Sequence, residues 1–191
     1  MKTDNKDIST PEYWDDVFLQ KNTDSKVDNL NTKIVQTIDR IADTMELITD
    51  NEIDILDIAS AHATLCKRLK VKFPNKNITA CDHSKEAKVI ANFLPYIVCD
   101  AYSIPFPDKS FDLIICTQAM EYMTDNNRFL IEAKRLGRKM IISVPNGEMQ
   151  NWSQLRIYDE NNFKELIEKF GAIEYIKVYN TMILAKIIFH E

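Results

Sequence analysis

Five short apolar segments, separated by stretches of helical pattern, constrain the fold of this chain more than any other feature. They are rich in β-branched residues, and apolar and polar residues mostly do not alternate within them. The segments are Asp54–Ile58, Ile78–Asp82, Tyr96–Asp100, Phe111–Cys116 and Lys139–Val144. Strands buried on both faces have this pattern, as in a parallel sheet. Helix-compatible segments between them are Ala63–Lys72, Ser84–Phe93 and Asp125–Leu136. The order predicts an α/β sheet with right-handed crossovers.

The two ends of the chain extend this pattern. Apolar residues with a helical period predict a helix over Thr32–Ile48, and Asp159 begins a second helical pattern that ends before Gly171. Two apolar segments then follow, Ile173–Tyr179 and Thr181–Phe189, close enough for a hairpin. We expect one domain over residues 1–191, with a polar and aromatic extension at 1–30 and an α/β core at 31–191.

Composition and motifs exclude several classes of function. The net charge is −5, which argues against a nucleic-acid substrate. No apolar run is long enough for a transmembrane span, and the first residues lack a signal core, so we expect a cytoplasmic protein with no membrane partner. The four cysteines form no CxxC pair, and neither a phosphate-binding loop nor a zinc-protease motif is present, so no metal site is expected.

Polar residues gather at the carboxyl ends of the expected strands, where open parallel sheets bind ligands. Asp57 is followed by the loop residues 59–63, Asp82 ends the second strand and Asp100 the third. A carboxylate at the end of the second strand is the usual partner of ribose hydroxyls in nucleotide-binding sheets. Alternatively, each aspartate caps the helix that follows it.

At these residues the chain resembles the class I methyltransferases that use S-adenosylmethionine, in the small-molecule subgroup called type 11. The matching segments, in the family's order, are ILDIASAHATLCKRL, ITACDHS, IVCDAYSIPFPDKSFDLIICTQAMEYM, RKMIISVPN and RIYDENNFKELIEKFG. The stretch Asp100–Ile114 is the most specific of them. The resemblance implies a Rossmann-like, seven-stranded, mostly parallel sheet with helices on both faces and a C-terminal antiparallel hairpin. It also implies methyl transfer from S-adenosylmethionine to a small-molecule O or N acceptor, with S-adenosylhomocysteine as product.

The resemblance further implies roles for individual residues. The residues that it places around the cofactor are Asp57, Ala59, Ser60, Ala61, Asp82, His83, Asp100, Ala101, Cys116 and Thr117. In it, Asp82 accepts hydrogen bonds from the ribose, while Asp100 meets the adenine amino group. The residues that it places toward the substrate are Glu121, Tyr122, Tyr13 and Trp14. For the aromatic pair, a surface helix that docks its apolar face is the alternative. No residue is assigned as the catalytic base.

The first loop departs from the family's glycine-rich pattern, because alanine stands at 59, 61 and 63. An alanine in left-handed backbone geometry costs roughly 1–2 kcal/mol, so three would cost about 3–6 kcal/mol. Alanines at negative φ would avoid nearly all of this cost. Two hypotheses follow: a working cofactor site with a narrower loop, or a catalytically inactive binding module or subunit, with a protein partner or as a homodimer. Strained or occluded geometry favours the module, and an open cleft lined by Asp82 and Asp100 favours the enzyme.

Overall fold

The computed structural model describes residues 10, 12, 15, 41–147 and 154–191. Of the helix expected over Thr32–Ile48, residues 41–46 are described and are helical. The aromatic pair Tyr13 and Trp14 lies outside the described residues, as does most of the extension at 1–30. Within the part of the chain that is described, no helix combines the length and the apolarity needed to cross a membrane.

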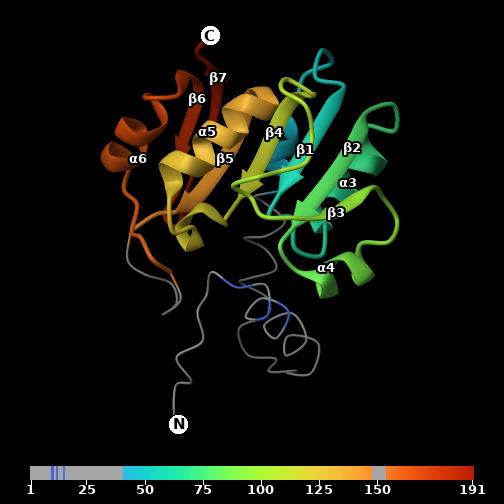
Figure 1. Ribbon diagram of the computed structural model, residues 1–191. Helices are drawn as coiled ribbons and strands as arrows, with labels where there is room; N and C mark the ends of the chain where they lie inside the picture. The colour runs from blue at the N-terminus through green and yellow to red at the C-terminus, as the bar shows by residue number, and fades with distance from the viewer. Residues whose placement is uncertain (1–9, 11, 13–14, 16–40, 148–153) are drawn as a thin grey trace.

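Seven strands form one sheet in the order β3-β2-β1-β4-β5-β7-β6 (Figure 1). They are β1 (Asp54–Ile58), β2 (Asn77–Asp82), β3 (Tyr96–Val98), β4 (Phe111–Thr117), β5 (Gly137–Pro145), β6 (Gly171–Val178) and β7 (Met182–Phe189). β7 runs antiparallel to both of its neighbours, and the other pairs are parallel. The predicted fold class, with its C-terminal antiparallel hairpin, is confirmed.

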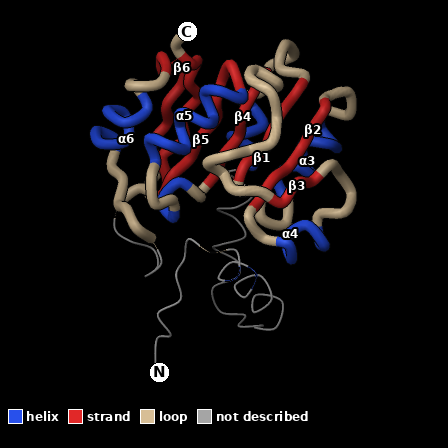
Figure 2. Tube along the Cα trace, viewed as in Figure 1, coloured by secondary structure: helices blue, strands red, loops and turns tan. Residues whose placement is uncertain are grey.

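Helices cover both faces of this sheet (Figure 2). They are α3 (Thr64–Lys72), α4 (Lys85–Ile90), α5 (Asn126–Leu136) and α6 (Glu160–Ile167), with a short 3-10 helix η2 (Met120–Tyr122) after β4. The side chains of Ser84, Asp125 and Asp159 accept hydrogen bonds from the first turns of α4, α5 and α6. These polar residues therefore fix where each helix begins.

Strand geometry divides the apolar residues into two cores. Because successive side chains of a strand point to opposite faces, Leu56 and Ile58 pack with α5 and α6. Ile55 packs instead with α3 and α4 on the other face. Asp57 follows the same alternation and points toward α3, which decides its environment below.

The order in which strands are added to the sheet reverses at β1. From β1 the chain proceeds to β2 and β3, then returns to lay β4 against the other side of β1. Ligands bind in the crevice outside the carboxyl ends of strands at such a switch point. The fold therefore places any small-molecule site between the ends of β1, β2 and β4.

Candidate functional site

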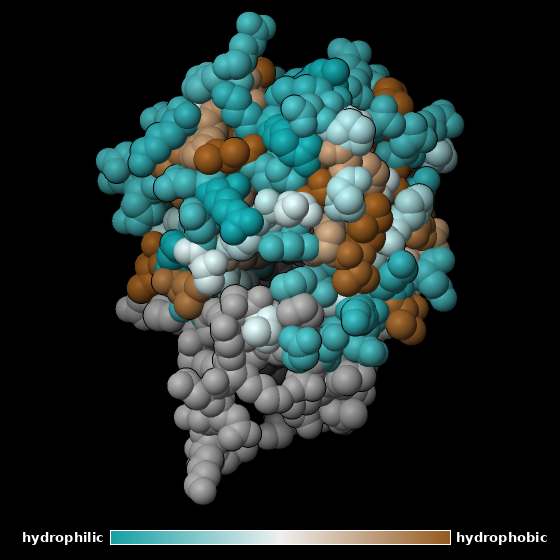
Figure 3. Space-filling model, viewed as in Figure 1, coloured by the Kyte–Doolittle hydropathy of each residue, from teal (hydrophilic) through white to brown (hydrophobic). Residues whose placement is uncertain are grey.

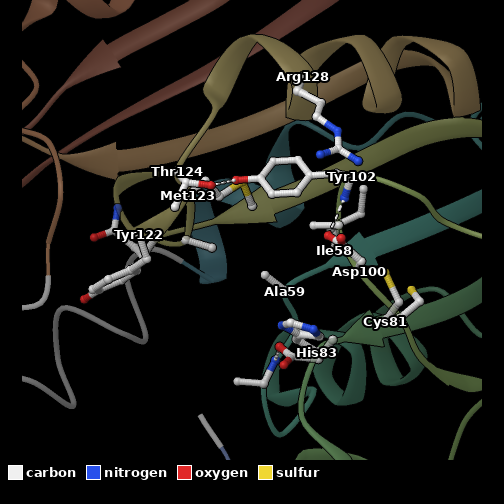
Figure 4. Close-up of a pocket in the computed structure, with 16 residues that line it drawn as sticks. Ile58, Ala59, Cys81, His83, Asp100, Tyr102, Tyr122, Met123, Thr124 and Arg128 are labelled. Carbon is white, nitrogen blue, oxygen red and sulfur yellow. Dashed lines mark hydrogen bonds between the residues drawn. The ribbon is translucent and has the colours of Figure 1, made fainter. Parts of the chain in front are cut away.

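A cleft of about 500 Å³ lies at this switch point. Its walls come from the carboxyl ends of β1 to β4, with Ala59 and His83 on one side and Tyr102, Met123 and Thr124 on the other (Figure 4). The volume is in the range of small-molecule sites, which span about 300–1,000 Å³. The cleft therefore has room for a cofactor and opens at the expected edge of the sheet.

The loop after β1 adopts left-handed geometry at each of its three alanines. The φ angles are 56° at Ala59, 49° at Ala61 and 53° at Ala63. Ala59 and Ala61 line the cleft, whereas Ala63 is fully buried at the start of α3. The sequence left open whether these alanines have positive or negative φ. The structure has the costly positive values, and the cleft beside the loop is nevertheless open.

Hydrogen bonds from neighbouring strands hold this loop in place. The Ser60 amide donates to the Cys81 carbonyl (3.1 Å), and the Ala61 amide donates to Asp82 Oδ2 (2.9 Å). The Tyr96 hydroxyl donates to the Ala61 carbonyl (2.9 Å). Because surrounding contacts over-determine the backbone, strained residues can persist here, as they do at functional sites in general.

Asp82 lies at the point where the loop, the cleft and α4 meet. Its Oδ1 accepts the Ser84 amide (3.0 Å) and its Oδ2 the Ala61 amide. Burial raises the pKa of Asp82, and these backbone donors oppose the shift. Each carboxylate oxygen has two lone-pair sites, so the side chain retains capacity to accept further hydrogen bonds from a ligand in the cleft.

Asp57 occupies a different position from the one that its place in the motif suggests. It is 2% exposed and does not line the cleft, because strand alternation turns it toward α3. There Cys66 Sγ donates to Asp57 Oδ2 at 3.1 Å. Burial, together with the charge of Asp82, raises the pKa of Asp57 to about 7, and the Cys66 hydrogen bond opposes that rise.

The opposite wall of the cleft is built by residues that the sequence patterns did not single out. Tyr102 bonds Thr124 Oγ1 through its hydroxyl (3.1 Å) and also accepts the Asp125 amide (3.1 Å). The Arg128 guanidinium lies 4.9 Å from the centre of the Tyr102 ring (Figure 4). Gln118 completes this wall with a left-handed φ of 53°. In the sequence, the signals for this wall are the aromatic residue Tyr102 directly after Asp-Ala and the basic residue Arg128 in the first turn of α5.

The structure brings together seven of the predicted residues at the cleft: Ala59, Ala61, Asp82, His83, Asp100, Ala101 and Tyr122. It places five others outside the lining: Asp57, Ser60, Cys116, Thr117 and Glu121. Cys116 points into the core under α5, and Glu121 is buried, with its carbonyl accepting the Leu155 amide. Tyr13 and Trp14 belong to the part of the chain that is not described.

Comparison with known proteins identifies the domain that holds this cleft. A family model described as a methyltransferase domain, of type 11, matches residues 56–140. This range runs from β1 into β5 and includes all residues that line the cleft. The most specific motif in the sequence, Asp100–Ile114, lies within it.

Two curated relatives share part of the sequence. A demethylmenaquinone methyltransferase of Thermotoga maritima is 33% identical over 109 residues, which are 52% of this chain and 48% of that protein. A ubiquinone/menaquinone biosynthesis C-methyltransferase of Shewanella frigidimarina is 30% identical over 92 residues, 45% of this chain and 35% of that protein. The chain thus spans about half or less of the length of these relatives.

Solved structures share the fold. Magnesium protoporphyrin IX methyltransferase from Synechocystis, solved with bound S-adenosylhomocysteine, has a TM-score of 0.74 at 10% identity and covers 94% of this chain and 98% of its own. A Haloferax volcanii methyltransferase in complex with the Trm112 activator has a TM-score of 0.69 at 14% identity, covering 78% and 88%. Sequence match and fold agree: residues 56–140 match the methyltransferase domain of type 11, and the fold is shared with methyltransferases, one of them solved with S-adenosylhomocysteine.

Proposed function

We propose that the cleft binds S-adenosylmethionine and that the protein transfers the methyl group to a small-molecule acceptor, leaving S-adenosylhomocysteine. The observation that carries this proposal is the open cleft of about 500 Å³ with Asp82 and Asp100 on its wall. An open cleft lined by these two carboxylates favours a cofactor site, whereas the left-handed backbone of the loop alanines favours the alternative considered below.

The residues present fit the cofactor's chemistry. Asp82 keeps acceptor capacity for ribose hydroxyls while two backbone amides fix its orientation. The Asp100 side chain is exposed, and its Oδ1 accepts the Tyr102 amide (2.9 Å), so the carboxylate is held at the cleft for an amino group of the base. The methyl groups of Ala59 and Ala61 narrow the wall but leave the cleft open.

For methyl transfer, the protein mainly has to hold the acceptor in the correct position relative to the cofactor. The cofactor supplies a sulfonium-bound methyl group that is already electrophilic. Holding an acceptor in line with it converts a bimolecular step into a unimolecular one, and such orientation can contribute about 7–11 kcal/mol. We expect an oxygen or nitrogen acceptor. Because the named relatives include C-methyltransferases, carbon nucleophiles belong among the acceptors tested.

A second candidate function is a catalytically inactive module that binds a protein partner or forms a homodimer. The strain at Ala59, Ala61 and Ala63 is the observation in its favour. The Haloferax neighbour was solved in complex with an activator protein, which gives this candidate a precedent for partner binding on a similar fold. The two candidates differ in whether the isolated chain binds the cofactor.

Calorimetric titration with S-adenosylmethionine and S-adenosylhomocysteine tests the proposal. We expect micromolar binding by the wild type and a loss of tenfold or more in Asp82→Asn, equal to about 1.4 kcal/mol. Asp112→Asn is the matched control, because Asp112 Oδ2 also accepts two backbone amides, those of Ile53 and Asp54, before and at the start of β1. It should bind as the wild type does. Absence of binding at millimolar cofactor would favour the inactive module.

Methyl transfer is then measured with labelled S-adenosylmethionine and a panel of small phenols, quinols, amines and carboxylic acids. A labelled, extractable product identifies the acceptor class. Cofactor binding without transfer to any of these would direct the search to a protein partner.

A further inference from the structure

Two cysteines lie side by side on the cleft wall. Cys81 is paired with Ile97 in the parallel register of β2 and β3, and Cys99 follows two residues after Ile97. The Cys99 amide donates to the Asp82 carbonyl (3.0 Å), which continues this pairing past the end of β3. Residues two apart on a strand share a face, so both thiols lie on the same face, and both line the cleft. Figure 4 shows Cys81 on the side of the cleft that carries Asp100.

The two neighbouring thiols differ in exposure. Cys81 is 1% exposed and Cys99 is half-buried. The neighbouring Cys81 thiol lowers the pKa of Cys99, while the Cys99 thiol and burial raise the pKa of Cys81. The thiolate is the reactive form of cysteine. Cys99 therefore has the character of the attacking thiol, and Cys81 that of a buried partner within reach.

The other two cysteines lack this arrangement. Cys66 and Cys116 are both fully buried, and burial raises the pKa of each thiol. Cys66 donates its hydrogen to Asp57 rather than to another sulfur. The only neighbouring pair among the four cysteines, with one thiol partly exposed, thus lies on the cleft wall.

We propose that Cys81 and Cys99 form an oxidation site for hydroperoxides. The Cys99 thiolate attacks one oxygen of hydrogen peroxide, the O–O bond breaks, and the products are a sulfenic acid on Cys99 and hydroxide, which takes up a proton. The Cys81 sulfur then attacks the Cys99 sulfur, an S–S bond forms, and the S–O bond breaks to release water. In sum, two thiols are oxidised to a disulfide and one peroxide is reduced to two waters.

Closing this disulfide changes the shape of the cleft. Diagonal neighbours on adjacent strands have Cα atoms about 7–8 Å apart, whereas disulfides span about 4.4–6.8 Å. The backbone must move, and β3 can do so because it is a three-residue edge strand with a single neighbour. Asp100 and Ala101 directly follow Cys99 and line the cleft, so the wall shifts with it. We infer, resting on the proposed function, that oxidation weakens cofactor binding.

The first arm of the test concerns the thiols alone. The reduced full-length protein is treated with hydrogen peroxide, digested without reductant and analysed by mass spectrometry. We expect one major crosslink, between the peptides of Cys81 and Cys99. Cys81→Ser should stop at a sulfenic acid on Cys99 that dimedone traps, and Cys66→Ser, which keeps a donor for Asp57, should still form the crosslink. Absence of the 81–99 crosslink in the wild type would overturn the proposal without any variant.

The second arm is a cofactor titration of reduced, oxidised and re-reduced wild-type protein. We expect at least tenfold weaker binding after oxidation and full recovery with dithiothreitol. Equal binding by the reduced and the crosslinked protein would refute the effect on the cleft. Peroxide sensitivity that persists in Cys81→Ser would refute the disulfide as its cause. If the reduced protein binds no cofactor, the proposed function fails, and the first arm still decides whether the oxidation site exists.

Discussion

The Asp82 carboxylate accepts the backbone amide of Ala61 at 2.9 Å, and this hydrogen bond joins the end of β2 to the loop after β1. The loop needs such a contact, because Ala61 and its neighbours Ala59 and Ala63 all hold left-handed backbone angles. The carboxylate that the family resemblance assigns to the ribose therefore also braces the strained segment. Figure 3 shows apolar residues gathered on the side of the molecule where β2 and β3 lie.

Replacing the loop alanines by glycine should relieve the strain. A left-handed alanine costs roughly 1–2 kcal/mol. Glycine removes this cost, but its greater freedom in the unfolded chain offsets about 0.4–1 kcal/mol of the gain in stability. We expect Ala59→Gly and Ala61→Gly each to raise the free energy of unfolding by about 0.5–1 kcal/mol. Ala63→Gly also loses a buried methyl group, worth about 0.8 kcal/mol, so its net change should be small. Urea unfolding measures all three.

The same variants separate strain from cleft shape. Ala59 and Ala61 line the cleft and Ala63 does not. We expect tighter cofactor binding in Ala59→Gly and Ala61→Gly, with Ala63→Gly as the matched control that binds as the wild type. Equal gains at all three positions would mean that loop freedom, rather than room in the cleft, limits affinity.

Asp57 should make stability fall as pH rises. Its pKa is about 7 in the folded protein against 3.8 as the ordinary value. Between these values the native state holds a proton that the unfolded state has lost, so the free energy of unfolding declines with a slope approaching about 1.4 kcal/mol per pH unit. Asp57→Asn cannot titrate and should flatten this slope. Urea unfolding between pH 4 and 8 tests it, and the exposed helix cap Asp125→Asn should keep the wild-type slope.

A buried ion cluster ties the segment before β1 to the sheet. Lys186 and Glu52 are 3% and 2% exposed in their side chains and 2.8 Å apart, and Lys186 also donates to the Leu47 carbonyl. Although burial acts to raise it, hydrogen bonds from Lys186, the Thr49 amide and Lys139 hold the pKa of Glu52 below its ordinary value. The stability that Glu52 contributes is thus present above its unfolded pKa and is lost as pH falls through its folded pKa.

Removing the buried cation should be costly. Lys186→Met leaves Glu52 buried with Lys139 as its remaining ionic partner, at 3.0 Å. We expect a loss of about 3–5 kcal/mol in the free energy of unfolding, as for a broken buried ion pair. The exposed pair Lys164–Glu160 on α6 provides the control, because Lys164→Met should cost less than about 1 kcal/mol. Similar losses in both variants would show that Lys186 acts through general packing alone.

The sequence predicts the sheet well because two-sided burial leaves an unmistakable unalternating pattern. β1 matches its expected residues, Asp54–Ile58, and the hairpin of β6 and β7 lies where predicted. β3 and α4 are shorter than expected; β3 is an edge strand paired with β2 alone, and the short α4 packs against these two strands at the same edge.

The site is predicted less completely, for a geometric reason. A motif names positions along the chain, whereas strand alternation decides which face each side chain takes. Asp57 and Cys116 lie on strands at the expected positions but point into opposite cores, under α3 and α5. Tyr102 and Arg128 reach the cleft from a loop and a helix turn that no strand pattern positions.

Arg135 holds the middle of the stretch Asp100–Ile114, which begins with the cleft residues Asp100–Tyr102. Its guanidinium donates to the carbonyls of Ile104 (2.9 Å) and Phe106 (2.8 Å) and pairs with Asp108 (2.9 Å). Glu132 pairs with Arg135 and accepts the Ile104 amide (2.7 Å). Two prolines in this loop have no N–H to donate, and one planar side chain supplies donors to two of the loop's carbonyls.

Arg135→Lys should therefore loosen this loop, because a single ammonium cannot reach the same acceptors. We expect a loss of about 1.5–3 kcal/mol in the free energy of unfolding, the value of a hydrogen bond to a charged group, and faster hydrogen exchange at the Ile104 amide. Arg138→Lys is the matched control, since its contacts with Lys109 and Asp112 are long (3.3 and 3.4 Å) and its side chain is 58% exposed. If Arg138→Lys lost as much, or if the Ile104 amide kept its protection in Arg135→Lys, the guanidinium would not be what holds this loop.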